Sequence, residues 1–247
     1  MTEFTISLAG VAARVEALYP ETERFCRDYL SAETPLFTVR VEQEDIDAER
    51  EKSAREDEIE GLPTRSFSDR YLERLAVYRK LAKKLLAYDT FLFHGSVVAL
   101  EGKAYLFTAL SGTGKTTHTR LWLKNIPGAH ILNGDKPLLR VEEHRVLACG
   151  TPWQGKENYG CNENLPLEAI CILERDTTNH IEPVSFGDAM GTLIQQANRP
   201  QEPALLLKTL ALIGMLDKRV RFYRLGCNME DEAAFVSFRG MTGEVDT

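Results

Sequence analysis

The stretch Ala109-Leu110-Ser111-Gly112-Thr113-Gly114-Lys115-Thr116 decides how this sequence is interpreted. Its spacing is typical of a phosphate-binding loop, in which two glycines permit a tight turn whose amides face phosphate oxygens. Lys115 would reach the β- and γ-phosphates of a nucleotide, and the Thr116 hydroxyl suits a Mg²⁺ ion. The strict pattern has Gly where this chain has Ala109. The competing interpretation is a glycine-rich strand-to-helix turn that binds nothing.

The flanking residues favour the phosphate loop. Ala104-Tyr105-Leu106-Phe107 before it is apolar and predicts a buried strand, and residues 117–124 after it predict a helix. The helix would present its positive N-terminal end to the same anion. We therefore predict that the phosphates of ATP are bound by Ser111, Gly112, Thr113, Gly114, Lys115, Thr116 and Thr117.

Two hairpins predict an α/β fold with a mixed sheet. Residues 92–100 form an expected strand, and the turn Glu101-Gly102-Lys103 leads into the strand that feeds the loop. A parallel βαβ unit would not place a hairpin there, so we expect a phosphate-loop core with partly antiparallel strands. A second expected hairpin pairs residues 138–141 with 146–149. Further strands are expected at 130–132, 169–173, 181–186 and 220–225, and helices at 187–197 and 204–217.

The chain is expected to have two parts. Residues 1–67 predict a small N-terminal α+β region, with strands at 4–8 and 36–41 and a helix at 22–30. Its acidic segment, residues 42–60, is typical of a solvated helix or a mobile surface segment. Residues 68–247 form the expected nucleotide-binding domain, which opens with an amphipathic helix at 68–88.

Composition narrows the classes of function. The 247 residues carry a net charge of −7 with a sequence pI of about 5.4, which argues against a nucleic-acid or membrane-surface partner. No apolar run approaches the roughly 20 residues of a membrane span, and the N-terminus lacks a signal-peptide pattern. Five scattered cysteines without a Cys-x-x-Cys pair argue against a disulfide framework or a zinc site. We therefore expect a cytoplasmic protein.

Asp135 is the candidate acid of the site. It ends a short expected strand 20 residues after Lys115, where a phosphate loop needs a carboxylate to hold Mg²⁺ together with Thr116. The same carboxylate could accept a proton from an attacking hydroxyl. Alternatively, Asn133-Gly134 marks a plain tight turn with Asp135 exposed.

Other polar residues are weaker candidates for catalysis or substrate binding. His94, beside Gly95, could contact phosphate or act in catalysis, or it could be a structural residue of an apolar strand. His118 could face the site or the interior. Lys156 and Arg199 could bind substrate or stabilise transferred charge, although an ordinary surface role fits Lys156 equally well.

These motifs resemble a known family. His94-Gly95, a hairpin, the loop, and an Asp at the end of the next strand resemble the catalytic domain of HPr kinase/phosphorylase, over roughly residues 90–175. The stretch LSGTGKTT at residues 110–117 is also similar to the loop of ATP-dependent phosphoenolpyruvate carboxykinase. Both families usually carry two adjacent acids where this chain has Gly134-Asp135. HPr kinase has Ser then Glu after the loop lysine, and here Thr116-Thr117 follows it.

The resemblance implies a Mg²⁺- and ATP-dependent kinase that transfers the γ-phosphoryl group to a hydroxyl of a peptide, protein or small metabolite. The resemblance is also consistent with a homo-oligomer. The missing second acid keeps open a nucleotide-binding regulator with weak ATPase activity. A carboxykinase-like lyase is the third alternative, but the oxaloacetate-binding arginine motif of that family is not evident in the chain.

Overall fold

The computed structural model describes residues 1–59, 61, 63–110, 112–155, 157 and 159–243. Their contacts divide the chain into two compact units, Met1–Leu85 and Leu86–Thr247. The division falls after helix α3 (Asp69–Leu85), not at the expected 67/68 boundary, because α3 packs on other elements of the first unit. The predictions for Ser111 and Lys156 lie outside the described residues.

The first unit is a three-stranded sheet with helices. Strand β1 (Thr2–Leu8) pairs antiparallel with β2 (Val11–Ala17), and β2 pairs parallel with β3 (Phe37–Arg40). Strand β2 was not predicted, because its hairpin turn, Ala9-Gly10, lacks the usual Asn-Gly or Asp-Gly signal. The helix expected at 22–30 is shorter, consisting of α1 (Pro20–Phe25) and the 3₁₀ turn η1 (Arg27–Tyr29).

Helix α3 contains a fully buried acid. The Glu73 carboxylate accepts hydrogen bonds from the backbone N–H of Leu18 at 2.5 Å and of Tyr19 at 3.3 Å, and from the Thr22 hydroxyl. Because Tyr19 is the N-cap residue of α1 and Thr22 lies in its first turn, this carboxylate anchors the start of that helix. The acidic segment forms helix α2 (Gln43–Ile59), which packs against α3.

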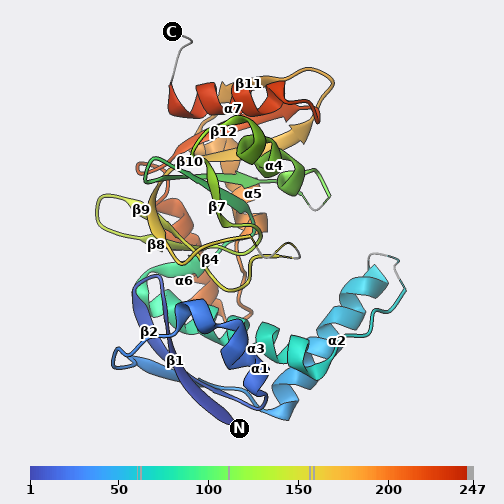
Figure 1. Ribbon diagram of the computed structural model, residues 1–247, viewed down its shortest axis with the longest axis vertical. Coiled ribbons are helices and arrows are strands. Elements are labelled where there is room, and N and C mark those ends of the chain that lie inside the picture. Colours follow the sequence, from blue (N-terminus) through green and yellow to red (C-terminus); the bar gives the residue numbers. More distant parts are fainter. Residues whose placement is uncertain (60, 62, 111, 156, 158, 244–247) are drawn as a thin grey trace. The chain divides into compact units, whose positions relative to one another are not determined.

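The second unit is built on a curled, mixed nine-stranded sheet, which confirms the α/β class (Figure 1). Its path is β4-β8-β9-β10-β6-β5-β7, with β12 beside β10 and β11 beside β12. The long strand β10 pairs antiparallel with β9 at its start and parallel with β6 and β12 further on. The strands are β4 (Thr90–Leu92), β5 (Ser96–Leu100), β6 (Lys103–Thr108), β7 (His130–Asn133), β8 (Leu138–Val141), β9 (Val146–Cys149), β10 (Asn164–Arg175), β11 (His180–Pro183) and β12 (Arg221–Cys227).

Both predicted hairpins are confirmed, β5 with β6 and β8 with β9. The strand expected at 92–100 is broken at Phe93, His94 and Gly95. Their amides donate instead to the carbonyls of other segments, at 2.8–3.1 Å. The break turns His94 out of the sheet ladder and toward the turn after β7.

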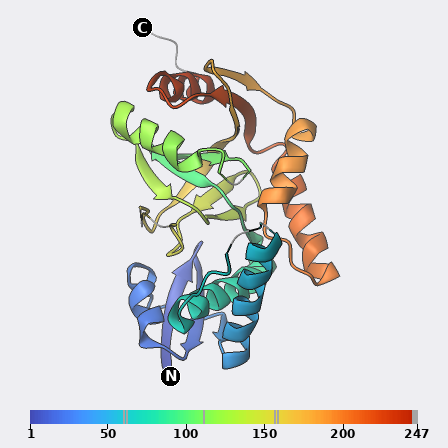
Figure 2. The same cartoon turned by 90° about the vertical axis from the view of Figure 1, so that its right-hand side faces the viewer.

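Helices cover both faces of this sheet, so its strands alternate between two cores. Val97 and Ala99 of β5 enter the core beneath α5 (Phe186–Gln196) and α6 (Pro203–Gly214). Val98 and Leu100 enter the core beneath α4 (Lys115–Asn125) and α7 (Glu232–Thr242). Figure 2 shows α5 and α6 in orange on one side of the sheet, with α4 in green and α7 in red on the other. Double coverage explains the nearly continuous apolar strands. Among the described helices, none has the length and apolar character needed to cross a membrane.

Candidate functional site

The glycine-rich stretch forms a tight turn between β6 and α4. Gly112 and Gly114 have positive φ angles of 77° and 127°, a backbone conformation that other residues rarely adopt. The amide and hydroxyl of Thr113 both donate to the Leu110 carbonyl, at 3.3 and 2.9 Å. Helix α4 begins directly at Lys115, two residues earlier than expected. The strand–turn–helix order required by the sequence pattern is therefore present.

Lys115 places a partly buried cation at this turn. Its ammonium group donates to the Ala109 carbonyl at 3.2 Å. Burial lowers the pKa of Lys115, and the nearby Asp135 carboxylate partly offsets that effect. No acidic residue lies in the first turn of α4, where Thr116 is exposed and Thr117 half-exposed. Together, the amine and the helix N-terminus make this turn suited to an anion.

Arg175 is a contact of the turn that the sequence did not reveal. It ends β10, and because β10 runs parallel to β6, the carboxyl ends of the two strands share one edge of the sheet. Its guanidinium donates to the Gly112 carbonyl at 2.5 Å and to the Thr113 carbonyl at 3.4 Å. No local motif marks this arginine, because the partner segment lies far away in the sequence.

The Asp135 turn is held by a buried amide side chain. The Asn133 Oδ1 accepts hydrogen bonds from the backbone N–H of Asp135 at 2.9 Å and of Lys136 at 2.7 Å. The Asn133 Nδ2 donates to the backbone carbonyl and hydroxyl of Thr151 at 3.2 and 3.0 Å. Gly95 donates its N–H to the Asp135 carbonyl at 3.0 Å. Asn133 is therefore a positioning residue, and Asp135 is not in a free surface turn.

The Asp135 carboxylate is ionised by its neighbours. His94 Nε2 lies 3.4 Å from one carboxylate oxygen and Lys136 Nζ lies 3.1 Å from the other. Burial acts to raise the pKa of Asp135, but His94 and Lys136 outweigh it and bring this pKa to about 2. A carboxylate so acidic is a poor general base at neutral pH, because an efficient base has a pKa near the working pH. The same ionised oxygens suit a hard cation.

Gln196 orients His94. The His94 Nδ1 lies 2.8 Å from the Gln196 Oε1, and the Gln196 carbonyl also accepts the His94 backbone N–H at 2.8 Å. With oxygen acceptors on both sides, both contacts are hydrogen bonds only if each ring nitrogen carries a proton. If Gln196 instead presents its amide nitrogen, a neutral ring can still donate from Nε2 to Asp135. Either arrangement directs Nε2 at Asp135.

The position before Asp135 has no space for a side chain. A Cβ at Gly134 would lie 2.6 Å from the Gln154 carbonyl oxygen, and one at Gly155 would lie 3.2 Å from the Asp135 Cβ. Among the described residues of the β9–β10 connection (150–155, 157 and 159–163), Gln154 and Gly155 therefore pack directly on the acid turn. Arg120 of α4 binds Glu157 of the same connection, with Nε 3.1 Å from the carboxylate. Glycine at position 134, where the families of the resemblance usually carry a second acid, is therefore required by this packing.

The structure places His94 in contact with Asp135 and places Lys115 near enough for the Asp135 charge to raise its pKa, but His118 and Arg199 lie elsewhere. His118 faces the interior, where its Nε2 lies 2.9 Å from the Ser237 hydroxyl and burial lowers its pKa to about 4. Arg199 is exposed between α5 and α6, and no hydrogen bond or ion pair between described residues joins it to His94 or Asp135.

Comparison with known proteins finds likeness among solved structures and not among sequences. No protein-family model and no curated protein matches the sequence. Among solved structures, the chain is similar to the Hpr(Ser) kinase/phosphatase from Coxiella burnetii, with 10% sequence identity and a TM-score of 0.36. The match covers 62% of this chain and 95% of that chain.

Proposed function

We propose that the protein is an ATP- and Mg²⁺-dependent phosphotransferase that moves the γ-phosphoryl group to a hydroxyl of a peptide, protein or small metabolite. The observation that carries the proposal is that a cation at the glycine turn, a carboxylate at the turn after β7 and a histidine beside that carboxylate lie in one neighbourhood. Lys115 lies at the start of α4 beside the glycine turn, the Asp135 carboxylate is close enough to act on its pKa, and His94 contacts that carboxylate.

These residues suit phosphoryl transfer because that reaction depends on positioning and charge neutralisation. Lys115 and the amides of the turn would bind the phosphates. The ionised Asp135 and the exposed Thr116 hydroxyl are the oxygen donors that Mg²⁺ prefers, and the ion would neutralise phosphate charge. Lys136 would then exchange its contact with Asp135 for solvent or phosphate. His94, held by Gln196, would stand beside Asp135 and steer the acceptor hydroxyl.

Labelled ATP tests the transfer itself. Purified protein is incubated with γ-labelled ATP and Mg²⁺, alone and with an extract of its own source, and the products are separated. We expect slow release of phosphate alone, because water can take the place of the hydroxyl, and a labelled acceptor when the extract is present. The Lys115→Ala variant controls for kinases in the extract. Label that appears equally with the variant, or phosphoenolpyruvate formed from oxaloacetate, would contradict the proposal.

The second candidate is a nucleotide-binding regulator that turns over ATP poorly. The steric exclusion at Gly134 favours it, because the β9–β10 connection occupies the place where a second carboxylate would stand. Asp135 must then hold the metal ion, which leaves the acceptor hydroxyl without a carboxylate base to activate it. Tight nucleotide binding without any labelled product would support the regulator over the kinase.

A further inference from the structure

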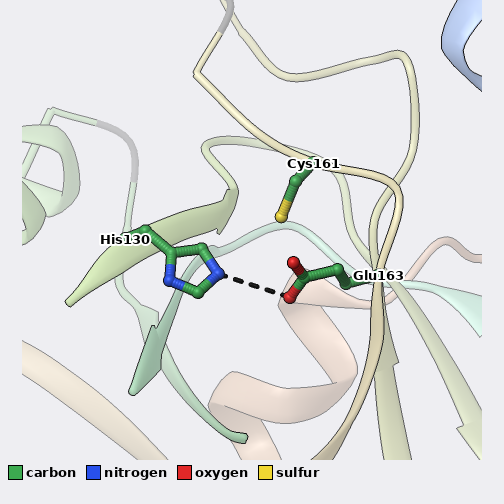
Figure 3. A group of neighbouring side chains, drawn as sticks. All are labelled: His130, Cys161 and Glu163. Atoms are coloured by element: carbon green, nitrogen blue, oxygen red, sulfur yellow. Dashed lines mark hydrogen bonds and ion pairs between the residues drawn. The ribbon is translucent and has the colours of Figure 1, made fainter. Parts of the chain in front are cut away.

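A second group of metal-binding side chains lies at the other end of β7. His130 begins that strand, and Cys161 and Glu163 lie in the β9–β10 connection just before β10. Figure 3 shows the three side chains pointing toward one another. One nitrogen, one sulfur and one carboxylate oxygen all lie within 4.8 Å of one another, and the His130 Nε2 is 3.3 Å from the Glu163 carboxylate.

The spacing fits a tetrahedral ion. Zinc binds His nitrogen and carboxylate oxygen at about 2.0–2.2 Å, so two such ligands of a tetrahedron lie about 3.3–3.5 Å apart. The His130–Glu163 separation already has this length. The Cys161 sulfur, now 3.7 Å from the Ile131 carbonyl, would need to move by about 1 Å to complete the third position. His130 and Glu163 are each about half-exposed, so an ion can enter from solvent.

The donor set selects the kind of metal. Imidazole, thiolate and carboxylate together suit Zn²⁺, whereas Mg²⁺ and Ca²⁺ prefer oxygen donors alone. Three protein ligands leave the fourth tetrahedral position for water. We propose that His130, Cys161 and Glu163 bind a Zn²⁺ ion. This site is separate from the Mg²⁺ site of the proposed function and does not depend on it.

The ion would join the β9–β10 connection to the strand that leads to Asp135. The backbone N–H of Cys161 already donates to the Leu132 carbonyl at 3.1 Å, and Gly160 forms an isolated bridge with Asn133. The same connection packs Gln154 and Gly155 against the acid turn. A ligand from β7 and two from the connection would therefore fix the packing around Asp135, so zinc occupancy would stabilise the candidate site without lying in it.

The sequence argued against zinc because no Cys-x-x-Cys pair is present. That rule detects ligands that are close together in the sequence, whereas these come from residues 130, 161 and 163 and meet only through the pairing between the connection and β7. The competing interpretation is a surface cluster without an ion, in which the Glu163 carboxylate is hydrogen-bonded to both His130 and the Cys161 thiol.

Metal binding to the full-length protein tests the site. The protein is stripped with a chelator and titrated with Zn²⁺ by calorimetry, and with Co²⁺ to record the absorption bands of a thiolate-bound tetrahedral ion. Single variants His130→Gln, Cys161→Ser and Glu163→Gln are compared with His144→Gln and Cys227→Ser, which change the same residue types outside the cluster. Asp135→Asn distinguishes this site from the acid turn.

We expect one Zn²⁺ per chain and a thiolate–Co²⁺ band. Each cluster variant should lose more than about tenfold in affinity, because even partners of direct ligands are worth 10–100-fold. Cys161→Ser should also lose the band, while both controls and Asp135→Asn bind as wild type. Zinc should slow hydrogen exchange at the Cys161 amide. Equal binding by wild type and all three cluster variants, or loss of binding in Asp135→Asn alone, would overturn the site.

Discussion

Asp135 shows how neighbours set the chemistry of one residue. Burial acts to raise its pKa, but the contacts with His94 and Lys136 outweigh that effect and hold the pKa well below the usual range. The low pKa favours the metal-binding role over the general-base role, which the sequence left open. In the proposed function, Asp135 therefore binds Mg²⁺ and His94 positions the acceptor.

Replacing Asp135 by Asn should weaken the response to Mg²⁺ more than nucleotide binding itself. The amide keeps the shape of the side chain but loses the charge that holds a hard cation. We expect the Mg²⁺ dependence of ATP turnover to move to higher concentration, while nucleotide affinity measured without Mg²⁺ changes little. If the Mg²⁺ dependence of ATP turnover in the variant coincides with that of the wild type and reaches the same rate, Asp135 has only a structural role.

His118 predicts a pH dependence of stability. Its ring packs edge-on against Phe107 at 4.7 Å, and its Nδ1 is buried without a hydrogen-bond partner among the described residues. Burial lowers its pKa from 6.5 to about 4 in the folded protein. The unfolded chain therefore binds the proton more tightly. The contribution of the neutral His118 ring to the unfolding free energy is therefore fully present above pH 6.5 and is lost as the pH falls through about 4.

A depression of this size corresponds to about 3 kcal/mol of unfolding free energy. The His118→Phe variant keeps an aromatic ring but cannot titrate, so it should lose about 3 kcal/mol less than wild type between pH 7 and pH 4. Urea unfolding followed by the fluorescence of the buried Trp122 measures both proteins. Asp135 titrates at lower pH and does not interfere. Parallel pH profiles would show that His118 is not the cause.

At the scale of elements, the β9–β10 connection is fixed by a close backbone approach at Gly134. Gly134→Ala places a Cβ 2.6 Å from the Gln154 carbonyl, so the connection must move away from the acid turn. We expect a loss of about 1–3 kcal/mol in unfolding free energy, typical of overpacking. ATP turnover should also fall, because the displaced connection packs on the turn that holds Asp135.

Gly191→Ala in α5 is the matched control for Gly134→Ala. Its added Cβ would meet nothing within 4 Å, and alanine suits a helix interior better than glycine by about 0.5–1 kcal/mol. Thermal unfolding should therefore shift down for Gly134→Ala and not for Gly191→Ala. Equal melting temperatures for both variants would contradict the close approach.

In the first unit, the buried Glu73 joins α3 to the start of α1. Glu73→Ala leaves the N–H groups of Leu18 and Tyr19 without their acceptor, and an unsatisfied buried group costs about 1–3 kcal/mol. Denaturant unfolding of the variant should show a loss of at least that size, because two donors are affected. The comparison is Asp69→Ala in the same helix, because this half-exposed acid pairs with Arg50 and the Tyr19 hydroxyl but accepts no backbone N–H from the start of α1 among the described residues. Equal small losses for both would mean that the carboxylate does not anchor the start of α1.

For the whole molecule, the sequence predicted what depends on local patterns. The glycine turn, both hairpins, the strand at residues 130–132 and the mixed sheet follow from periodicity and turn chemistry, and the structure has them. Helix α7 was not predicted, and the break at His94 could not be, because its amide donates to Gln196, 102 residues away along the chain. Nonlocal pairing decides such features, and sequence patterns do not encode it.

The same distinction applies to the site. Lys115 and Asp135 were predicted because a motif and a strand end mark them. Gln196 and Arg175 were missed because each acts through a partner far along the chain. Asn133 binds the nearby amide of Asp135, but its side chain is held by Thr151, 18 residues away, which no local pattern reveals. The zinc ligands were missed for the same reason.

The central claim is that the turn at residues 110–116 binds the phosphates of ATP, and calorimetric titration with ATP in the presence of Mg²⁺ tests it most directly. Lys115→Ala removes a charge-assisted contact of about 1.5–3 kcal/mol, so affinity should fall by at least about tenfold while the fold is retained. Lys124→Ala, at the other end of the same helix and paired with Asp231, should bind as wild type. Equal affinity in wild type and Lys115→Ala, or no binding by the wild type, would contradict the account.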